Sequence, residues 1–218
     1  MTAHSTYVDA AFPLSGPAIP IDHGYPLFAA LSRRLPTLHD SRHWAVHPVR
    51  GSYRQDRGVL ELISESQVKI RLPADELAHI IGLAQATLDI RGHHYTLGYP
   101  RIYPLITAPL LKSRLVVIKG HTGDPEGFGD AVRRQLAALP GLGCDPERIQ
   151  IIVGPRRVVR VKGVPIPGHA VSLSGLDVTA CLVVQIHGLG GRHHLGAGVF
   201  VPPGMHNGSA SSAPVAGS

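Results

Sequence analysis

The glycine-rich stretch near the end of the chain, residues 185–200, has the composition of an anion-binding loop. Glycine has no Cβ, so such a loop can adopt positive φ and let its backbone N–H groups approach another molecule closely. Successive N–H groups in that geometry form a concavity for an anion, and Arg192 adds positive charge beside His193 and His194. A glycine-rich turn between two core elements is the alternative interpretation. The glycines that we expect to contribute are Gly188, Gly190, Gly191, Gly196 and Gly198.

Two common nucleotide-binding motifs do not fit this loop. A Walker A loop requires Lys followed by Ser or Thr after its last glycine, whereas Val199 follows Gly198 here. A dinucleotide fingerprint requires the spacing G-x-G-x-x-G, and counted from Gly188 the third glycine position holds His193. The loop therefore predicts a phosphate site of another kind.

The fourteen histidines are the second group of residues that could do chemistry. An imidazole exchanges its proton near neutral pH, so histidines can cleave RNA without a metal by removing the 2′-hydroxyl proton and protonating the leaving 5′-oxygen. His39, His43 and His47 are spaced by four, which on one helix would bring them together as metal ligands. However, Pro36 and Pro48 bracket this segment, and no further ligand motif accompanies it. We therefore predict neither a metal nor another cofactor.

The densest positive run of the chain could follow a nucleic-acid backbone. As a strand, it would place Arg156, Arg160 and Lys162 on one face and Arg157 on the other. Cations at this spacing can contact successive phosphates. The alternative is an edge strand whose charges prevent aggregation. Because Lys119 and other cations lie in the same half of the chain, we favour RNA binding.

The pattern of apolar residues predicts two successive units that could position these side chains. The first has the order β-α-β-β-α-β, with strands at 7–14, 59–63, 68–72, 87–90 and 95–97 and helices at 25–35 and from 73 onward. The second repeats this order, with strands at 114–118, 149–153, 157–162, 170–173 and 199–201 and helices at 124–139 and 177–186. Strands 59–63 and 68–72 are expected to pair as a hairpin.

This repeated order predicts an α+β fold of tandem ferredoxin-like (RRM-like) β-α-β-β-α-β units with a C-terminal glycine-rich loop. Aromatic residues make up 5% of the chain, so RNA would be recognised through charge and shape rather than by stacking on a sheet. We expect the following divisions: an N-terminal domain over 1–101, a linker over 102–112, a C-terminal domain over 113–203 and a disordered tail over 204–218.

Composition supports a folded protein with a polyanionic partner. The chain has 218 residues, 44% hydrophobic residues and a net charge of +6, and a basic surface favours nucleic acid. Its two cysteines cannot form a disulfide framework. No apolar run approaches the roughly 18 residues of a membrane span, and no signal peptide is evident. We therefore expect a cytoplasmic protein without a membrane partner.

Four segments together resemble a known family. They are residues 22–33, Leu38 with His39, residues 47–51 and the glycine-rich segment 187–198. Over about residues 7–203 the chain resembles the CRISPR repeat-processing endoribonucleases, the sixth Cas protein, in the branch found with myxobacterial-type loci.

The resemblance implies a metal-independent endonuclease that cleaves precursor CRISPR RNA within its repeats. The 2′-hydroxyl would attack in line, leaving a 2′,3′-cyclic phosphate and a 5′-hydroxyl. The implied partners are a repeat RNA with a stem-loop and other subunits of an interference complex, with no requirement for DNA. By position, the resemblance makes His39 the leading acid or base, with His23 and His47 as assistants. It also places RNA on the glycine-rich loop and on residues 156–162.

Two other classes of function remain open at this stage. A non-catalytic RNA-binding subunit of a CRISPR ribonucleoprotein would keep its function when His39, His23 and His47 are changed to Ala, but lose it when Arg156 and Arg160 are changed. An enzyme that uses the glycine-rich loop for a small phosphate ligand would bind a nucleotide saturably.

Overall fold

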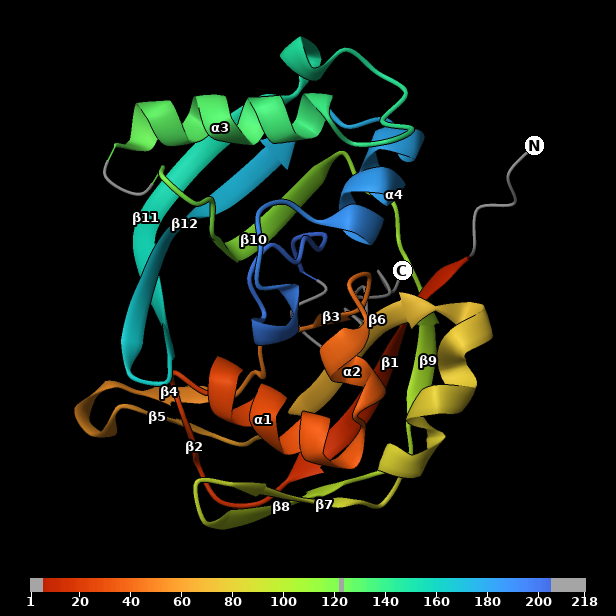
Figure 1. Cartoon of the computed structure of the whole chain (residues 1–218), viewed down its shortest axis with the longest axis vertical. Helices are drawn as coiled ribbons and strands as arrows, with labels where there is room; N and C mark the ends of the chain where they lie inside the picture. Colours follow the sequence, from red (N-terminus) through yellow and green to blue (C-terminus); the bar gives the residue numbers. More distant parts are fainter. Residues whose placement is uncertain (1–5, 122–123, 205–218) are drawn as a thin grey trace, which may run out of the picture.

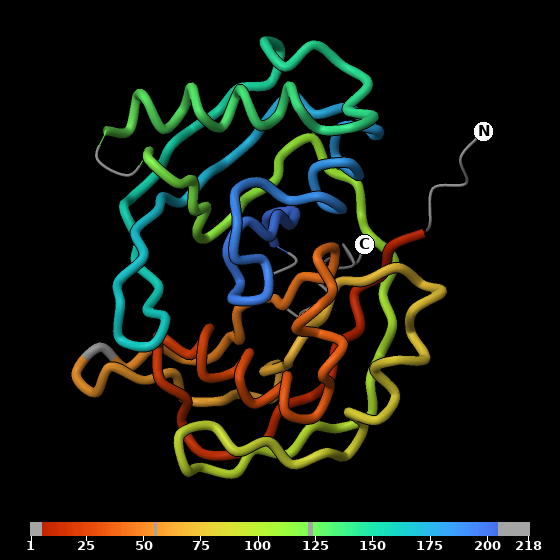
Figure 2. Tube along the Cα trace, in the orientation of Figure 1, coloured from red at the N-terminus to blue at the C-terminus, as the bar shows by residue number. Residues whose placement is uncertain are grey.

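The computed structural model describes residues 6–121 and 124–204. The tail expected over 204–218 lies, apart from Gly204, outside the described residues. Figures 1 and 2 show an N-terminal and a C-terminal α+β half packed against each other, with the glycine-rich loop (blue) where they meet. Each half has its own hydrophobic core, one within 8–97 and the other within 111–200. Within the described residues, no helix is long and apolar enough to cross a membrane.

The N-terminal half is built on an antiparallel sheet. Its elements in chain order are β1 (Tyr7–Ser15), β2 (Ile19–Pro20), α1 (Gly24–Arg34), α2 (Thr37–Asp40), β3 (Ala45–Val46), β4 (Ser52–Arg54), the 3₁₀ helix η1 (Gln55–Arg57), β5 (Val59–Glu61), β6 (Gln67–Pro73), the 3₁₀ helix η2 (Ala74–Leu83), β7 (Thr87–Ile90), β8 (His93–Leu97) and β9 (Arg101–Pro104). Strand β1 is central, with β6 and β3 on one side and β9 and the β7–β8 hairpin on the other. The series β1-α1-β3-β6-η2-β9 therefore gives the ferredoxin-like order that the sequence predicted.

The strand pairing within this unit differs from the predicted hairpin. β5 pairs with β2 and β4 in a small separate sheet, whereas β6 pairs with β1 and β3. Val68, Ile70 and Leu72 of β6 are buried, so that strand belongs to the main core. Alternating apolar and polar residues predict a strand but not the strand it pairs with, because pairing depends on contacts between distant parts of the chain. The second strand of the ferredoxin-like unit is the two-residue β3, too short to recognise from a pattern.

The predicted helix after Pro73 is a 3₁₀ helix, η2. Leu77, Ile80 and Leu83 are spaced by three and face the core. Ile81, which α-helical spacing from Leu77 would also bury, is 65% exposed. A 3₁₀ helix has three residues per turn, so residues three apart share a face. The α-helical spacing therefore gave the wrong phase.

The segment expected as a linker, 102–112, contains two strands. β9 pairs with β1, from Val8 opposite Pro104 to Ala11 opposite Arg101. Pro104 is tolerated because it ends the strand, where a missing N–H costs little. The next strand begins at Leu110, so the connection between the halves is residues 105–109.

The C-terminal half repeats the order with one long hairpin. Its elements are β10 (Leu110–Val116), α3 (Pro125–Ala137), the 3₁₀ helix η3 (Pro146–Arg148), β11 (Gln150–Val161), β12 (Val164–Ser174), α4 (Val178–His187) and the 3₁₀ helix η4 (His193–Leu195). The expected strands 149–153 and 157–162 are one strand, β11, with a register shift between Val153 and Arg156. The sheet order is β10-β12-β11, and the expected last strand is reduced to a bridge between Val201 and Lys112 on β10. This bridge occupies the fourth-strand position of a ferredoxin-like sheet.

A buried ionic network joins the halves. The guanidinium of Arg71, 1% exposed, donates to both carboxylate oxygens of Asp9, from Nε to Oδ1 at 2.8 Å and from Nη2 to Oδ2 at 3.1 Å. Its Nη1 donates to the carbonyls of Gln185 at 2.8 Å and Phe200 at 2.9 Å, both in the C-terminal half. Burial alone would raise the pKa of Asp9, but the adjacent cation and His47 outweigh burial and lower it. Arg71 therefore fixes the end of α4 and the chain after the glycine-rich loop onto the N-terminal sheet.

Candidate active site between the two halves

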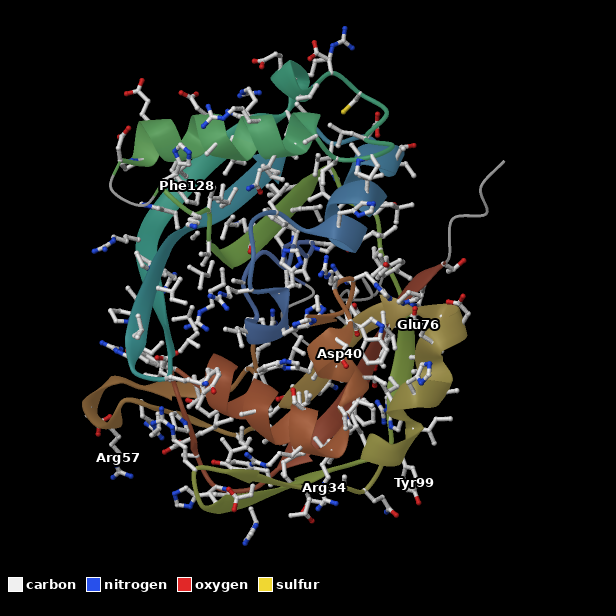
Figure 3. The ribbon with its side chains drawn as sticks, in the orientation of Figure 1. Arg34, Asp40, Arg57, Glu76, Tyr99 and Phe128 are labelled. Carbon is white, nitrogen blue, oxygen red and sulfur yellow. The ribbon has the colours of Figure 1, made fainter. Side chains whose placement is uncertain are left out.

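The turn after the first helix places His39 at the junction of the halves. Leu27 and Leu31 of α1 are buried, and Pro36 and the short α2 redirect the chain so that Leu38 is buried and His39 is exposed. In Figure 3 the neighbouring Asp40 marks the end of α2 close to the C-terminal half. The resemblance had selected His39 by this position after the first helix.

An aromatic side chain organises two imidazoles from different halves. Phe28 of α1 stacks with His39, with ring centroids 5.9 Å apart and an interplanar angle of 24°. It also stacks with His194 of η4, at 5.5 Å and 8°. The two histidines are thus held by one ring although they are 155 positions apart in the chain (194 − 39). This cluster is complete only when the C-terminal half is docked.

His194 has a defined tautomer in this arrangement. Its Nε2 lies in hydrogen-bond contact with the carbonyl oxygen of Ser41, which can only accept, so Nε2 carries the proton. The other nitrogen, Nδ1, is then an acceptor in the neutral ring. Burial lowers the pKa of His194; the bond to Ser41 opposes this effect, and His39 and His43 add to it. A neutral imidazole with a free acceptor nitrogen suits a general base.

His43 is held on the rim of this cluster by an acid. Its Nε2 lies 2.9 Å from Oε1 of Glu76, and the indole of Trp44 donates to Oε2 of the same carboxylate. Glu76 comes from η2, so the second helix of the ferredoxin-like unit orients His43. Because His43 is on a bend and His47 follows β3, the three histidines spaced by four do not share a helix. Within the described residues, no group of three His, Cys, Asp or Glu side chains is arranged to hold a metal.

His23, expected to assist catalysis, has a structural position instead. It is 1% exposed, and both ring nitrogens are used: Nδ1 donates to the Pro20 carbonyl at 2.9 Å, and Nε2 accepts from the Val49 N–H at 3.0 Å. Burial lowers its pKa to about 4, and the bond to Pro20 opposes this only in part. His23 is therefore a neutral buried link between the start of α1 and the chain after β3.

This buried imidazole makes stability depend on pH. Because the folded pKa is about 4 and the ordinary value is 6.5, the unfolded chain binds the proton more readily between these values. We expect the contribution of His23 to be complete above pH 6.5 and to fall by up to about 3 kcal/mol as the pH approaches 4. Urea unfolding at pH 7.5 and pH 5 measures it, with His23→Gln as the variant that lacks this titration. An equal loss of stability in both proteins would contradict this assignment.

His47, the other expected assistant, is also buried. Its Nε2 lies 3.2 Å from Oδ1 of Asp9, within the network that holds Arg71. Burial lowers its pKa to about 4, although the neighbouring carboxylate opposes the effect. RNA could not reach this ring without opening the contact between the halves. Among the three predicted catalytic histidines, His39 alone is exposed.

The glycine-rich loop does not form the predicted cradle of N–H groups, because many of these groups are bonded within the protein. The N–H of Gly190 donates to Oε1 of Gln135, that of Gly191 to the Val117 carbonyl and that of Gly198 to the Leu115 carbonyl. Further N–H groups with a partner inside the protein are those of Gly188, Leu189, Gly196 and Ala197. The second alternative from the sequence, a small phosphate ligand bound by this backbone, therefore loses its basis.

The glycines are required for close packing. A Cβ on Gly198 would lie 2.2 Å from the carbonyl oxygen of Leu189 and 2.7 Å from the ring of His193, and the backbone there has φ +70°. His193 fills the space between Gly188 and Gly198, and its Nε2 is buried without a hydrogen-bond partner among the described residues. Burial lowers its pKa. Arg192 and Gly191 are exposed, so they are the parts of the loop that RNA can contact.

A small cavity lies at the junction of the halves, lined by His43 and His193, the neighbour of His194 in the chain. It measures about 100 Å³ and lies between the chain before β3 and the glycine-rich loop. The polar residues that line it are Arg42, His43, Gln185, His187 and His193. The junction therefore offers cationic and imidazole groups from both halves.

The predicted basic strand reaches the N-terminal half. Arg156, Arg157 and Arg160 are exposed on β11. The backbone N–H of Arg160 donates to Oδ2 of Asp22 at 3.0 Å. Lys162 lies beyond the end of β11 with φ +50°, so it does not share a strand face with Arg160 as predicted. Lys119 is exposed in the turn after β10.

The fold and the site define a class of protein: two ferredoxin-like units with acid–base groups and a basic strand where they meet. The chain belongs to the Cas6 family, since the family model described as Cas6 Crispr matches residues 8–204. The CRISPR-associated endonuclease Cas6 of Myxococcus xanthus (strain DK1622) is 39% identical over 198 residues, covering 91% of this chain and 82% of that protein. The resemblance predicted from the sequence is confirmed.

Solved structures share the fold at low sequence identity. A CRISPR associated protein Cas6 matches with a TM-score of 0.61 at 13% identity, covering 91% of this chain and 99% of that chain. The product of a Cas6-related gene from Pyrococcus furiosus matches at 0.64 and 16% identity, covering 90% and 98%. A RAMP protein described as binding different RNA substrates matches at 0.65 and 15% identity, again covering 90% and 98%. The tandem ferredoxin-like fold is thereby confirmed.

Two members of the cluster were not predicted. His194 lies next to His193 in the printed sequence, but composition gives no reason to choose one over the other. In the 3₁₀ turn η4 the two rings diverge, one packing against glycines and the other against Phe28. Phe28 looks like an ordinary core residue of α1, and no sequence signal distinguishes it.

Proposed function

We propose that this member of the Cas6 family is a metal-independent endoribonuclease that cleaves precursor CRISPR RNA within the repeats, with His39 and His194 as its acid–base pair. The relative from Myxococcus xanthus is named as an endonuclease, which supports the activity. The RNA is a repeat with a stem-loop, no DNA is required, and the product enters an interference complex with other subunits. The reaction takes place in the cytoplasm, where the precursor is available.

The reaction requires two proton transfers and produces no net change in proton number. A base removes the proton of the 2′-hydroxyl, and the oxygen attacks the adjacent phosphorus. The bond from phosphorus to the 5′-oxygen breaks, and an acid protonates that oxygen. Nδ1 of His194 is the candidate base because its Nε2 proton is held by Ser41. His39 is the candidate acid. Arg192, which is exposed and lies two residues before His194 in the chain, can offset charge on the phosphate.

The stacking of His39 and His194 on Phe28 is the observation that carries this proposal. It holds an exposed imidazole of one half and a half-buried imidazole of the other against the same aromatic ring. The acid and the base must lie on opposite sides of one phosphodiester. Two histidines held in place on different elements, α2 and η4, can meet this requirement. A purely structural cluster would not require an exposed ring.

The ends of the cleaved RNA test the proposal. We expect the upstream fragment to end in a 2′,3′-cyclic phosphate and the downstream fragment in a 5′-hydroxyl, because the attacking oxygen comes from the RNA itself. Kinase labelling of the downstream fragment without prior phosphatase treatment detects the free hydroxyl. A 5′-phosphate on that fragment would show that water is the nucleophile and would overturn the mechanism. Binding without any product would favour the alternative, a non-catalytic RNA-binding subunit of a CRISPR ribonucleoprotein.

A further inference from the structure

A second cavity lies between the halves, where two arginines converge. It measures about 60 Å³ and is lined on one side by the start of α1, including Asp22 and Gly24. On the other side Arg114 of β10, Arg157 of β11 and the residues that end η4 complete it. A single water needs about 10–15 Å³ in this measure, so the space can hold a small group such as a phosphate.

The two guanidinium groups lack a direct counter-charge. In the part of the chain that the structure describes, neither Arg114 nor Arg157 has a carboxylate within ion-pair distance. Desolvation lowers the pKa of Arg114, and the positive charge of Arg157 lowers it further. Asp22 raises this pKa, but by less than Arg157 lowers it. Repulsion between the two arginines thus outweighs the attraction of the nearby carboxylate.

Asp22 is already engaged. Its Oδ2 accepts the backbone N–H of Arg160 at 3.0 Å, and Nη1 of the same arginine lies 3.9 Å away. The carboxylate therefore contacts the far end of β11 rather than the two converging guanidinium groups. Two arginines whose nearest carboxylate is bonded elsewhere can bind a phosphate through several charge-assisted hydrogen bonds.

We propose that Arg114 and Arg157 hold a non-scissile phosphate of the bound RNA. The inference rests on the proposed function, and it adds a specific contact of the substrate. Leu195 and Gly196 line the cavity, and His194 directly precedes them, so the phosphate lies close to the cleaved bond along the RNA. Because the cavity contains none of the proposed acid–base groups, the pair contributes to binding and not to the chemical step.

The test is a binding cycle between protein and RNA variants. The probe is the repeat RNA with a single 2′-deoxy nucleotide at its cleavage site, so that it binds without being cut. A series of these RNAs carries a neutral methylphosphonate at one position at a time. We expect Arg114→Gln and Arg157→Gln each to weaken binding about tenfold and to reduce the slope of log Kd against log salt by about 1. Single-turnover cleavage of the unmodified RNA at saturating enzyme should keep its rate.

One methylphosphonate position should identify the bound phosphate. There the neutral substitution should weaken binding to the wild-type protein about tenfold but have little further effect on the Arg114→Gln/Arg157→Gln protein. Arg34→Gln is the matched control. Arg34 lies at the end of α1, the helix whose start lines the cavity, and its side chain points away from the C-terminal half in Figure 3. It should behave as wild type.

The outcomes separate the two proposals. If every methylphosphonate reduces the affinity of the double variant for RNA as much as it reduces that of the wild type, the proposed phosphate site is wrong. This holds whether or not the RNA is cleaved. If one position is coupled to the arginines but the unmodified RNA is never cleaved, the site stands and the endonuclease proposal fails. Melting temperatures close to wild type are expected, because among the described residues neither side chain has an ion-pair partner to lose.

Discussion

Changing His39 to Ala is expected to reduce the single-turnover rate of RNA cleavage by 10²- to 10⁴-fold, the usual range for loss of a general acid or base. The affinity for uncleaved RNA should change little, because His39 contributes one exposed ring among many cationic contacts. The change also removes one stacking contact with Phe28, so the free energy of unfolding is not a suitable readout of the catalytic role. Single-turnover cleavage at saturating enzyme isolates the chemical step.

The controls for this prediction are a second histidine of the cluster and a distant one. His194→Ala should reduce the rate by a similar factor and abolish one limb of the pH–rate profile, as expected for the second member of an acid–base pair. His93→Ala, on the exposed face of β8, should cleave as wild type. Full activity in His39→Ala would move the acid role to His43 or His187, the exposed imidazoles that line the cavity at this junction.

Changing Arg71 to Met is expected to lower the free energy of unfolding by about 3–5 kcal/mol, since it leaves Asp9 buried without its main partner. It also leaves the carbonyls of Gln185 and Phe200 without the donor that joins them to the N-terminal sheet. Urea unfolding at pH 7.5 measures the loss. Because these bonds hold the chain on both sides of the glycine-rich loop, cleavage should slow as His194 loses its place.

Two comparisons make this second prediction specific. Asp9→Asn combined with Arg71→Met should cost less than the sum of the single changes, because no buried charge then remains unpaired. Arg54→Met removes an ion pair with Glu61 that is nearly as short, 2.9 Å against 2.8 Å for Arg71 and Asp9, but lies on the surface. It should cost no more than about 1 kcal/mol. Equal costs for Arg71→Met and Arg54→Met would show that the buried network does not join the halves.

The sequence was sufficient where the structure depends on local spacing. The helices predicted at 25–35 and 124–139 are present as α1 and α3, with Leu27 and Leu31 buried on the first and Phe128 and Leu136 on the second. The tandem ferredoxin-like order also followed from these local patterns. The family model matches residues 8–204, so the family prediction is confirmed over the described chain apart from its first residues.

The sequence was insufficient where a role depends on a distant partner. His23 and His47 resemble His39 in position, but Val49 and Asp9 occupy their ring nitrogens. The glycines indicated close approach of the backbone, yet the neighbour is β10 of the same protein rather than a phosphate. Likewise, nothing local to His194 reveals the ring of Phe28 on another element. Burial and pairing between the halves decide these roles, and neither is encoded in short-range spacing.

The most direct test of the central claim is cleavage of a labelled repeat RNA in EDTA, beside the same RNA with one 2′-deoxy nucleotide at the cut site. The account predicts a discrete product from the unmodified RNA at full rate without metal, and no product from the deoxy RNA, because the nucleophile is missing. Cleavage of the deoxy RNA, or a product that requires added metal, would contradict the account.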